Sequence, residues 1–280
     1  MAKKTANPPK PPAELPREPA RELVKETPFE AVASTCSVLV IGLFILTFLG
    51  QNFVIPSGSM EKTLLIGDHL LVDRITLAPP PRWMPLVRYR EPHRGDIVVF
   101  IRPAREPEPD ADGNPQYLIL VKRLVAVPGD RIHLHQGVLY LNGVAQPPPP
   151  EGLDTPLPPS QQSYVDEFPS LLPTTADTHG AVDPWIVELP SHIENGDLVV
   201  PPNKFFMMGD HRHGSLDSRF WGFVPRENIM GRPLFNYWSF QTPDDQQDKT
   251  GIGNTLAWMG HVALHFFTDT RWSRTLQRVK

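Results

Sequence analysis

Cysteine is nearly absent from this chain of 280 residues, which carries Cys36 and no other. No disulfide can therefore form within the chain, and a cysteine-rich metal site is excluded. An excess of positive charge is also lacking, because 27 Lys and Arg stand against 31 Asp and Glu, giving a net charge of −4. This charge balance leaves no basic footprint for nucleic acid, so we expect no nucleic-acid partner. Internal repeats are missing as well.

A recognisable set of metal ligands is missing too. The ten histidines are scattered along the chain. His133 and His135 alternate on an expected strand, and His211 and His213 share an expected loop, but the spacing offers neither pair an obvious third ligand. We therefore expect that the protein uses neither a metal nor a cofactor.

Proline, in contrast, is abundant and concentrated in two places. Residues 1–30 contain seven prolines, interspersed charge and no aromatic residue before Phe29, a composition typical of a disordered tail. Residues 146–202 form a second proline-rich stretch, which we expect to be an insertion of mostly irregular structure. Within it, residues 185–187 and 198–200 fit short strands.

Residues 31–50 contain no charged side chain, and a helix of about 20 apolar residues matches the thickness of a bilayer. We expect a membrane anchor over residues 31–51. A cleaved signal peptide fits less well, because it has a short basic start and a shorter apolar core. The preceding basic residues are Arg17, Arg21 and Lys25, whereas only Lys62 follows at a similar distance. The positive-inside tendency therefore places the tail in the cytoplasm and the residues after 51 outside it.

The chain beyond the anchor has short β-branched runs separated by turn residues, which predicts an all-β domain over residues 52–245. Residues 103–116, rich in proline, charge and glycine, are expected to form a loop. The strands are expected at residues 69–73, 97–101, 117–127, 131–135 and 138–141, and ordered structure is expected to return at residues 204–210. Residues 246–280 are mildly amphipathic, and a helix at 256–267 is expected to pack on the domain or rest on a bilayer surface.

The first candidate for chemistry is Ser59, which follows the small residues Ser57 and Gly58. It lies nine positions after the apolar run and is therefore expected to be held near the membrane. A serine becomes a nucleophile only when a base takes its proton. Strand alternation places Lys122 on one face with Leu120 and Leu124. Burial there would lower the pKa of the amine and leave it able to act as that base. The alternative is a lysine whose stem lies along the apolar face while its head reaches water.

Four segments together resemble the bacterial type I signal peptidases, membrane-anchored serine–lysine proteases that remove signal peptides from exported proteins. In chain order the segments are Ser57-Gly58-Ser59-Met60, residues 95–100, Lys122-Arg123 followed by Pro128-Gly129-Asp130, and residues 209–222. The resemblance covers most of residues 31–240, and the order and joint presence of the four segments make it specific. It implies a mainly β fold, an antiparallel β-sheet catalytic domain tethered by one N-terminal transmembrane helix to the bacterial cytoplasmic membrane.

The resemblance also implies roles for individual residues. Ser59 matches the nucleophile, Lys122 the general base, and Ser57 the residue whose hydroxyl joins the backbone N–H of Ser59 in the oxyanion hole. Ser215 matches the serine that orients the lysine amine. Asp217 and Arg219 match a structural ion pair near the site. The alternative interpretation of these two residues is an ordinary solvent-exposed ion pair. Two further positions matched near the site are Arg123 and Asp210.

Two departures from the family pattern stand out. Lys62 replaces the usual proline three residues after the nucleophile. Residues 211–214 read His-Arg-His-Gly where the family often has Asn-Arg-Asp-Asn, which removes a carboxylate near Arg219. The family pattern therefore does not predict in detail how the loop that carries Ser215 is braced.

Two alternatives belong to other classes. Ser59-Met60-Glu61-Lys62 also fits the S-x-x-K motif of penicillin-binding enzymes, and residues 140–142 and 249–251 supply the two accompanying short motifs in the right order. That fold, however, needs a large helical region where strands and prolines are expected here. The other alternative is an anchored β-domain that only binds a partner, which leaves the serine–lysine set unexplained.

The favoured interpretation is a membrane-bound endopeptidase that acts through an acyl-enzyme. Its expected partners are the signal peptides of secretory preproteins and the lipid bilayer. The substrate would bind as an extended strand by main-chain hydrogen bonds. Small side chains at the first and third positions before the cut would select the site of cleavage.

Overall fold

The computed structural model describes residues 27–44, 50–77, 89–103, 108–109, 115–149, 164–171, 184–246, 249 and 251–279. Most of the predicted tail, residues 45–49 of the predicted anchor, and residues 150–163 and 172–183 of the proline-rich insertion lie outside this set. The chain forms two compact units, Met1–Leu43 and Phe44–Lys280.

One described helix, α1 (Pro28–Phe44), begins just before the apolar run and lies in the first unit except for its last residue. Its start carries a reciprocal cap: the Glu30 N–H donates to Thr27 Oγ1 over 3.3 Å, and the Thr27 N–H donates to the Glu30 carboxylate over 2.8 Å. Within the described part of the chain, no helix combines the length and hydropathy required to cross a membrane.

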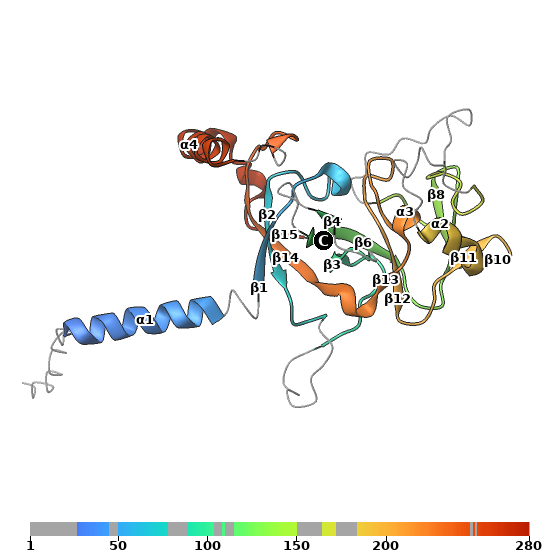
Figure 1. The fold of residues 1–280 in the computed structure, drawn as a ribbon, viewed down its shortest axis with the longest axis horizontal. Coiled ribbons are helices and arrows are strands. Elements are labelled where there is room, and N and C mark those ends of the chain that lie inside the picture. The colour runs from blue at the N-terminus through green and yellow to red at the C-terminus, as the bar shows by residue number, and fades with distance from the viewer. Residues whose placement is uncertain are drawn as a thin grey trace, which may run out of the picture. The chain divides into compact units, whose positions relative to one another are not determined.

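The second unit is mainly antiparallel β-sheet, which confirms the β-sheet part of the predicted fold class (Figure 1). The larger sheet has the order β1-β2-β14-β3-β6-β12-β13, with β15 paired to β14. Every pairing in it is antiparallel. Its strands are β1 (Gly50–Val54), β2 (Asp68–Asp73), β3 (Ile97–Ile101), β6 (Ile119–Ala126), β12 (Lys204–Met208), β13 (Val224–Pro225), β14 (Ile229–Ser239) and β15 (Gln277–Arg278).

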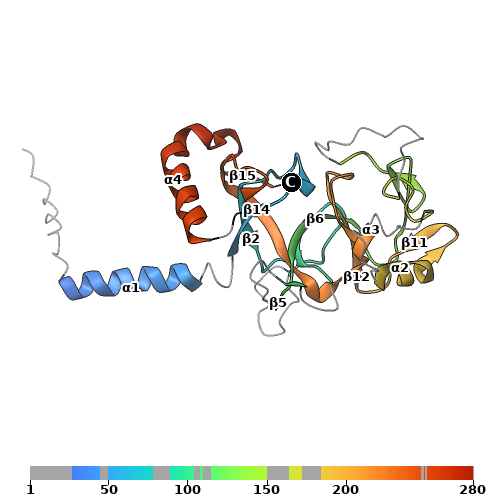
Figure 2. The ribbon, with the colours of Figure 1, turned by 45° about the horizontal axis from the view of Figure 1, so that its top comes forward.

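A smaller sheet has the order β10-β11-β7-β8-β9. Its strands are β7 (Arg131–His135), β8 (Val138–Leu141), β9 (Val144–Ala145), β10 (Ile193–Glu194) and β11 (Asp197–Val199). The β7–β8 hairpin turns at Gln136 and Gly137, whose φ angles of 51° and 74° are the left-handed values that a tight two-residue turn requires. In both views, β11 and α2 lie beyond β12, on the opposite side from β2 (Figures 1 and 2).

Two local predictions were wrong. The expected loop at 103–116 contains a short ladder between β4 (Glu108–Pro109) and β5 (Pro115–Gln116). Residues 185–187 belong to a helix, α2 (Pro184–Glu188), instead of a strand. Proline suits a first helical position because its φ is already fixed there, and one turn is enough to bury Trp185 in the core.

The remaining helical elements are short, except for α4 (Ile252–Asp269) near the C-terminal end. They are α3 (Ser218–Trp221) and the 3₁₀ turns η2 (Gly58–Met60), η4 (Leu189–His192), η5 (Arg226–Asn228) and η7 (Trp272–Arg274). In both ribbon views α4 lies on the β2 side of the larger sheet (Figures 1 and 2).

Buried apolar side chains form three clusters that together fix the positions of the loops. One joins the smaller sheet to β6 and β12, and includes Leu134, Phe168 and Phe206. A second lies around β3, β6 and α3. The third contains Met60, next to Ser59, together with side chains of β1, β2 and β3. The turn that carries Ser59 is therefore held by the packing of its own neighbour.

Candidate active site

The Ser59 turn, defined as Ser57–Met60, follows β1 after two intervening residues and contains the 3₁₀ turn η2. Before it, the Ile55 N–H donates to the Asp68 carbonyl over 2.9 Å. After it, Met60 is 1% exposed. Ser59 itself is half-buried, and its hydroxyl lies 3.5 Å from the exposed hydroxyl of Ser57. The turn therefore presents two hydroxyl groups at the surface while its end is fixed in the core.

Lys122 lies in the middle of β6, paired with Val98 of β3, and is 3% exposed. Its Nζ donates to Ser59 Oγ over 2.5 Å, across 63 positions of sequence. Burial lowers the pKa of Lys122 to about 8; the nearby Asp217 and Asp210 carboxylates oppose this shift, and Arg219 adds to it. A lysine in this state exchanges its proton near neutral pH, as a general base must.

The Ser215 loop, defined as Gly209–Leu216, connects β12 to α3 and lies against the Ser59 turn. The His211 N–H donates to the Ser59 carbonyl over 3.2 Å. Gly209 has no room for a side chain, since a Cβ there would stand 2.5 Å from the Ser59 carbonyl oxygen and 2.3 Å from Ser215 Oγ. Ser215 is 4% exposed, and its hydroxyl finds no hydrogen-bond partner among the described residues. A buried hydroxyl without a partner is costly and points to a role in the site.

Asp217 and Arg219 form a fully buried ion pair immediately after this loop, so the solvated alternative does not apply. Arg219 Nε donates to Asp217 Oδ1 and Arg219 Nη2 to Asp217 Oδ2, each over 2.9 Å, and both side chains are 0% exposed. Asp217 also accepts the N–H of Gly209 over 3.0 Å. Burial raises the pKa of Asp217, but Arg219 and these hydrogen bonds outweigh it and lower the pKa below its usual value. The pair thus fixes the start of the Ser215 loop.

A second buried ion pair joins the three segments of the site. Arg123, next to Lys122, donates from Nε and Nη2 to the two carboxylate oxygens of Asp210, each over 2.7 Å. Asp210 also accepts the hydroxyl of Thr63 over 2.6 Å. One carboxylate therefore connects β6, the Ser215 loop and the chain that follows Ser59.

The residues after Ser59 are also bound by the C-terminal part of the chain. Arg274 Nη2 donates to the Thr63 carbonyl over 2.9 Å and to the buried carboxylate of Asp68 over 2.7 Å. Arg271 donates to the Ile66 carbonyl over 2.9 Å. The 3₁₀ turn η7 and the residue before it therefore complete the support of the Ser59 turn.

All eight residues singled out from the sequence thus gather around one point. Lys62, in contrast, is exposed, and among the described residues the lysine bonded to Ser59 is Lys122. Strands β2, β3, β6 and β7 occupy the region where a penicillin-binding enzyme needs helices, so that alternative is wrong. In the described part of the chain, no three His, Cys, Asp or Glu side chains are placed to hold a metal ion.

Sequence reasoning missed two contributors to the site. They are Thr63, which binds Asp210, and Gly209, whose lack of a side chain allows the loop to approach Ser59. Neither has a signal of its own in a single sequence. A threonine four residues after a serine is unremarkable, and the glycine is needed because of packing against a segment 150 positions earlier.

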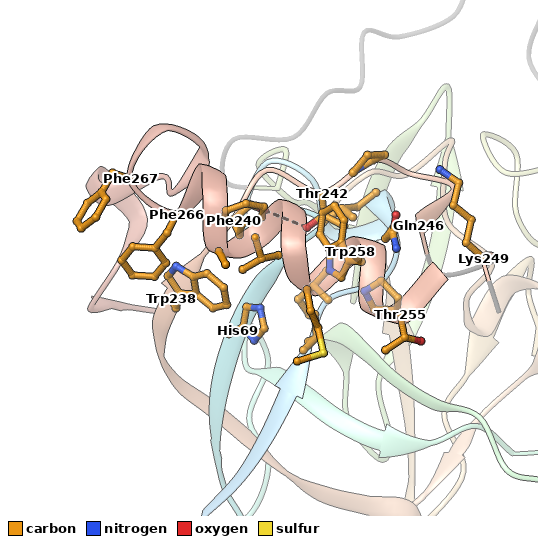
Figure 3. A pocket seen from close by; sticks show the side chains of 18 residues that line it. His69, Trp238, Phe240, Thr242, Gln246, Lys249, Thr255, Trp258, Phe266 and Phe267 are labelled. Atoms are coloured by element: carbon orange, nitrogen blue, oxygen red, sulfur yellow. Dashed lines mark hydrogen bonds between the residues drawn. The ribbon is translucent and has the colours of Figure 1, made fainter. Parts of the chain in front are cut away.

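An apolar groove of about 870 Å³ lies between the inner face of α4 and the sheet, close to the start of the Ser59 turn. Figure 3 shows Trp258 and Phe266 of α4 facing Trp238 and Phe240 at the end of β14. Ile55 and Pro56, which lead into the Ser59 turn, also line the groove.

An antiparallel β-domain that holds a buried lysine amine against a serine hydroxyl has the architecture of a serine–lysine hydrolase. Residues 29–238 match the family described as signal peptidase, peptidase S26. The chain belongs to this family, and the resemblance seen in its four motif segments is confirmed.

Individual relatives agree with this membership. The signal peptidase I of Pseudomonas fluorescens is 32% identical, over 74% of this chain and 71% of the relative. A probable signal peptidase I-2 of Synechocystis sp. is 30% identical, over 73% and 69%. The signal peptidase I of Leptolyngbya laminosa is 28% identical, over 80% and 87%. Membership in this family makes the chain a serine endopeptidase and excludes a β-domain that only binds a partner.

Proposed function

We propose that this peptidase removes N-terminal signal peptides from exported preproteins, with Ser59 as the nucleophile and Lys122 as the general base. The observation that carries the proposal is the contact of 2.5 Å between Lys122 Nζ and Ser59 Oγ, made by an amine that is 3% exposed. Desolvation disfavours the charged ammonium, so a neutral amine is available near neutral pH to accept the serine proton.

The reaction has two halves. Lys122 takes the proton of Ser59 as Oγ attacks the carbonyl carbon of the scissile peptide bond. The resulting oxyanion is stabilised by the Ser59 N–H and the Ser57 hydroxyl, and one such donor typically contributes about 10²–10³ in rate. The mature protein leaves as an amine that receives the proton from Lys122. Water, deprotonated by the same amine, then releases the signal peptide from Ser59.

The other residues of the site hold this pair in place. The unpartnered hydroxyl of Ser215 is suited to accept a hydrogen bond from the Lys122 amine and so orient its lone pair toward Ser59. The Asp217–Arg219 and Arg123–Asp210 pairs are proposed to fix the loop and the strand on either side. Two buried ion pairs beside one amine also keep the surrounding charge balanced.

The substrate is proposed to bind as an extended strand beside the Ser59 turn. The apolar cluster that includes Ile55, Met60 and Leu64 lies next to Ser59 and supports shallow apolar pockets there. Shallow pockets favour small side chains at the first and third positions before the cut, which gives the small-x-small selectivity expected from the sequence.

The enzyme is proposed to be anchored by residues 31–51 in the bacterial cytoplasmic membrane, with its N-terminus in the cytoplasm and its catalytic domain outside. The support is the charge-free run and the basic residues that precede it. The bilayer is also the proposed partner of α4, a helix of 18 residues with no buried side chain.

The apolar character of α4 supports this second membrane contact. Its Ile252, Leu264 and Phe267 are 82%, 84% and 79% exposed, and Asp269 at its end is its only acidic or basic residue other than histidine. Such a helix is suited to lie in the plane of the membrane surface. Because the groove behind it opens beside Pro56, lipid contact at α4 would hold the Ser59 turn close to the bilayer.

The decisive experiment compares cleavage of a purified preprotein in detergent by the full-length protein and its Ser59→Ala, Lys122→Ala and Lys62→Ala variants. We expect the first two variants to be inactive while folded and Lys62→Ala to retain activity. If Lys62→Ala alone is inactive, Lys122 is not the general base. If the unaltered protein cleaves no preprotein, the proposed function is refuted.

A further inference from the structure

One part of the proline-rich insertion is ordered against the Ser215 loop. This segment, Tyr164–Leu171, is named here the clasp segment. It lies nearly fifty positions from the Ser215 loop in sequence, yet its side chains include some of the most buried in the protein: Tyr164 is 3%, Asp166 1% and Phe168 0% exposed. Burial of this degree is unusual in a stretch whose composition predicts irregular surface.

The clasp segment makes direct hydrogen bonds with Arg219. Arg219 Nη1 donates to the Val165 carbonyl over 3.2 Å, and the Tyr164 hydroxyl donates to the Arg219 carbonyl. Trp185, also in the insertion, donates from its indole N–H to the same carbonyl over 3.0 Å. The side of Arg219 that Asp217 does not occupy is therefore held by the insertion.

A further contact reaches the Ser215 loop itself. His213 Nε2 donates to Asp166 Oδ1 over 2.8 Å, with the carboxylate 2% exposed. Within the Ser215 loop the acidic residue is Asp210, whose carboxylate is bound by Arg123. Asp166 supplies a second carboxylate to this loop from outside it.

The clasp segment is in turn held by the smaller sheet. The Leu134 N–H donates to the Phe168 carbonyl over 2.6 Å, and the Gly137 N–H donates to the Asp166 carbonyl over 3.1 Å. The ring of Phe168 packs against Phe206 of β12, with centroids 5.5 Å apart. The segment is thus a fixed bridge between the β7–β8 hairpin and the Ser215 loop.

We propose that Tyr164 and Asp166 are positioning residues of the peptidase, and that through Arg219 and His213 they hold the Ser215 loop against Ser59 and Lys122. Two routes connect the clasp segment to the loop. In the first, Asp166 binds His213 of the loop directly. In the second, Val165 and Tyr164 bind Arg219, which binds Asp217. Asp217 in turn accepts the N–H of Gly209, which packs against the Ser59 carbonyl. The inference rests on the proposed function, because it assigns the loop a task in that reaction.

The test compares Asp166→Asn with Asp197→Asn in the full-length protein. Asp197 is a matched control, because it contacts His133 over 2.6 Å in the smaller sheet with no contact to the Ser215 loop. We expect Asp166→Asn to lower kcat by about tenfold or more with little change in KM, since displacement of a catalytic group by less than 1 Å has effects of this order. We expect Asp197→Asn to leave both constants unchanged.

Two further measurements separate positioning from simple structural support. The acid limb of the pH–rate profile should move to higher pH in Asp166→Asn. A loosened loop would admit water to Lys122, and hydration of the ammonium would raise the pKa of this lysine. The charged groups that face Lys122 are Asp217, Arg219 and Asp210. Tyr164→Phe, which removes one hydroxyl, should shift the limb in the same direction. A lower melting temperature with unchanged kcat and unchanged acid limb would overturn the proposal.

Hydrogen exchange makes the inference testable apart from catalysis. Exchange of the Gly209 and His211 amides should be faster in Asp166→Asn than in Asp197→Asn, whether or not a preprotein is cleaved. Unchanged exchange would refute the proposal that the clasp segment holds the Ser215 loop. If the unaltered protein cleaves and Ser59→Ala does not, the proposed function stands, and the Asp166 comparison alone decides the inference.

Discussion

The backbone N–H of His211 donates a hydrogen bond to the carbonyl oxygen of Ser59 over 3.2 Å. This bond joins the Ser215 loop to the Ser59 turn without passing through any side chain. Movement of the loop therefore moves the serine itself. The same close approach explains why the first residue of the loop is a glycine, because Gly209 must pass between Ser215 and the Ser59 carbonyl.

Gly209→Ala should therefore abolish most activity. Its Cβ would stand 2.5 Å from the Ser59 carbonyl oxygen, closer than any real contact, so either the turn or the loop must shift. We expect cleavage to fall by about 100-fold. Gly260→Ala in α4 is the control, because a Cβ there meets nothing within 4 Å. It should retain full activity, and equal losses in the two variants would contradict the steric argument.

The dependence of kcat/KM on pH should follow the Lys122 amine. Burial lowers the pKa of this group to about 8, and only the neutral amine can accept the serine proton. The rate should therefore rise by about tenfold per pH unit below that value and level off above it. The Lys62→Ala variant should show the same profile. A rate that is already constant at pH 6 would show that Lys122 is not the base.

The same burial predicts a change in stability. A lysine whose folded pKa lies below its unfolded value of 10.5 destabilises the folded state while it is charged, so stability rises with pH between about 8 and 10.5. Lys122→Met should therefore increase the free energy of unfolding by about 3 kcal/mol at pH 7, with a gain that disappears by pH 10.5. Lys62→Met is the exposed control and should show no gain. Chemical unfolding in detergent at several pH values measures both.

Asp217→Asn should destabilise the protein strongly. The substitution keeps the shape of the side chain but leaves the buried guanidinium of Arg219 without its counter-charge, which costs about 3–5 kcal/mol. Asp245→Asn breaks an exposed pair with Lys249 and should cost less than about 1 kcal/mol. Thermal unfolding of the two variants side by side measures the difference, and similar melting temperatures would mean that the buried pair is not needed.

Contact of α4 with lipid can be followed with a dye attached to single cysteines in a Cys36→Ser background. Leu264→Cys places the dye on α4, and Val144→Cys places it on β9; the two native side chains are 84% and 63% exposed. In vesicles of phosphatidylethanolamine and phosphatidylglycerol that contain spin-labelled lipid, we expect quenching at position 264 and little at position 144. Equal quenching at the two positions would count against an interfacial role for α4.

Much of the fold could be predicted because local signals and tertiary packing agree. Residues 131–141 contain two alternating runs around Gln136-Gly137, and this short pattern is sufficient to specify the β7–β8 hairpin. Residues 97–101 are a continuous apolar run, and they form β3 with the predicted bounds. The helix of α2 was not predicted, because a run of three apolar residues fits one helical turn as well as a strand.

The site was predictable only in part. The family resemblance of the motif segments predicted Ser59, Lys122 and Ser215 as site residues, but whether Lys122 was buried or reached water depended on the loop packed over it. The contact between Asp166 and His213 had no signal in the sequence, because the two are 47 positions apart and the first lies in a proline-rich stretch. Composition describes what a segment is made of and does not reveal what it packs against.

The hydrogen bond between Arg274 and the Thr63 carbonyl spans 211 positions of sequence. Synthesis proceeds from the N-terminal end, so Ser59 is made long before the arginine that supports its turn. A partly synthesised chain thus contains Ser59 without the hydrogen bonds from Arg274. The Ser59 turn therefore gains its complete support only after residue 274 has been added.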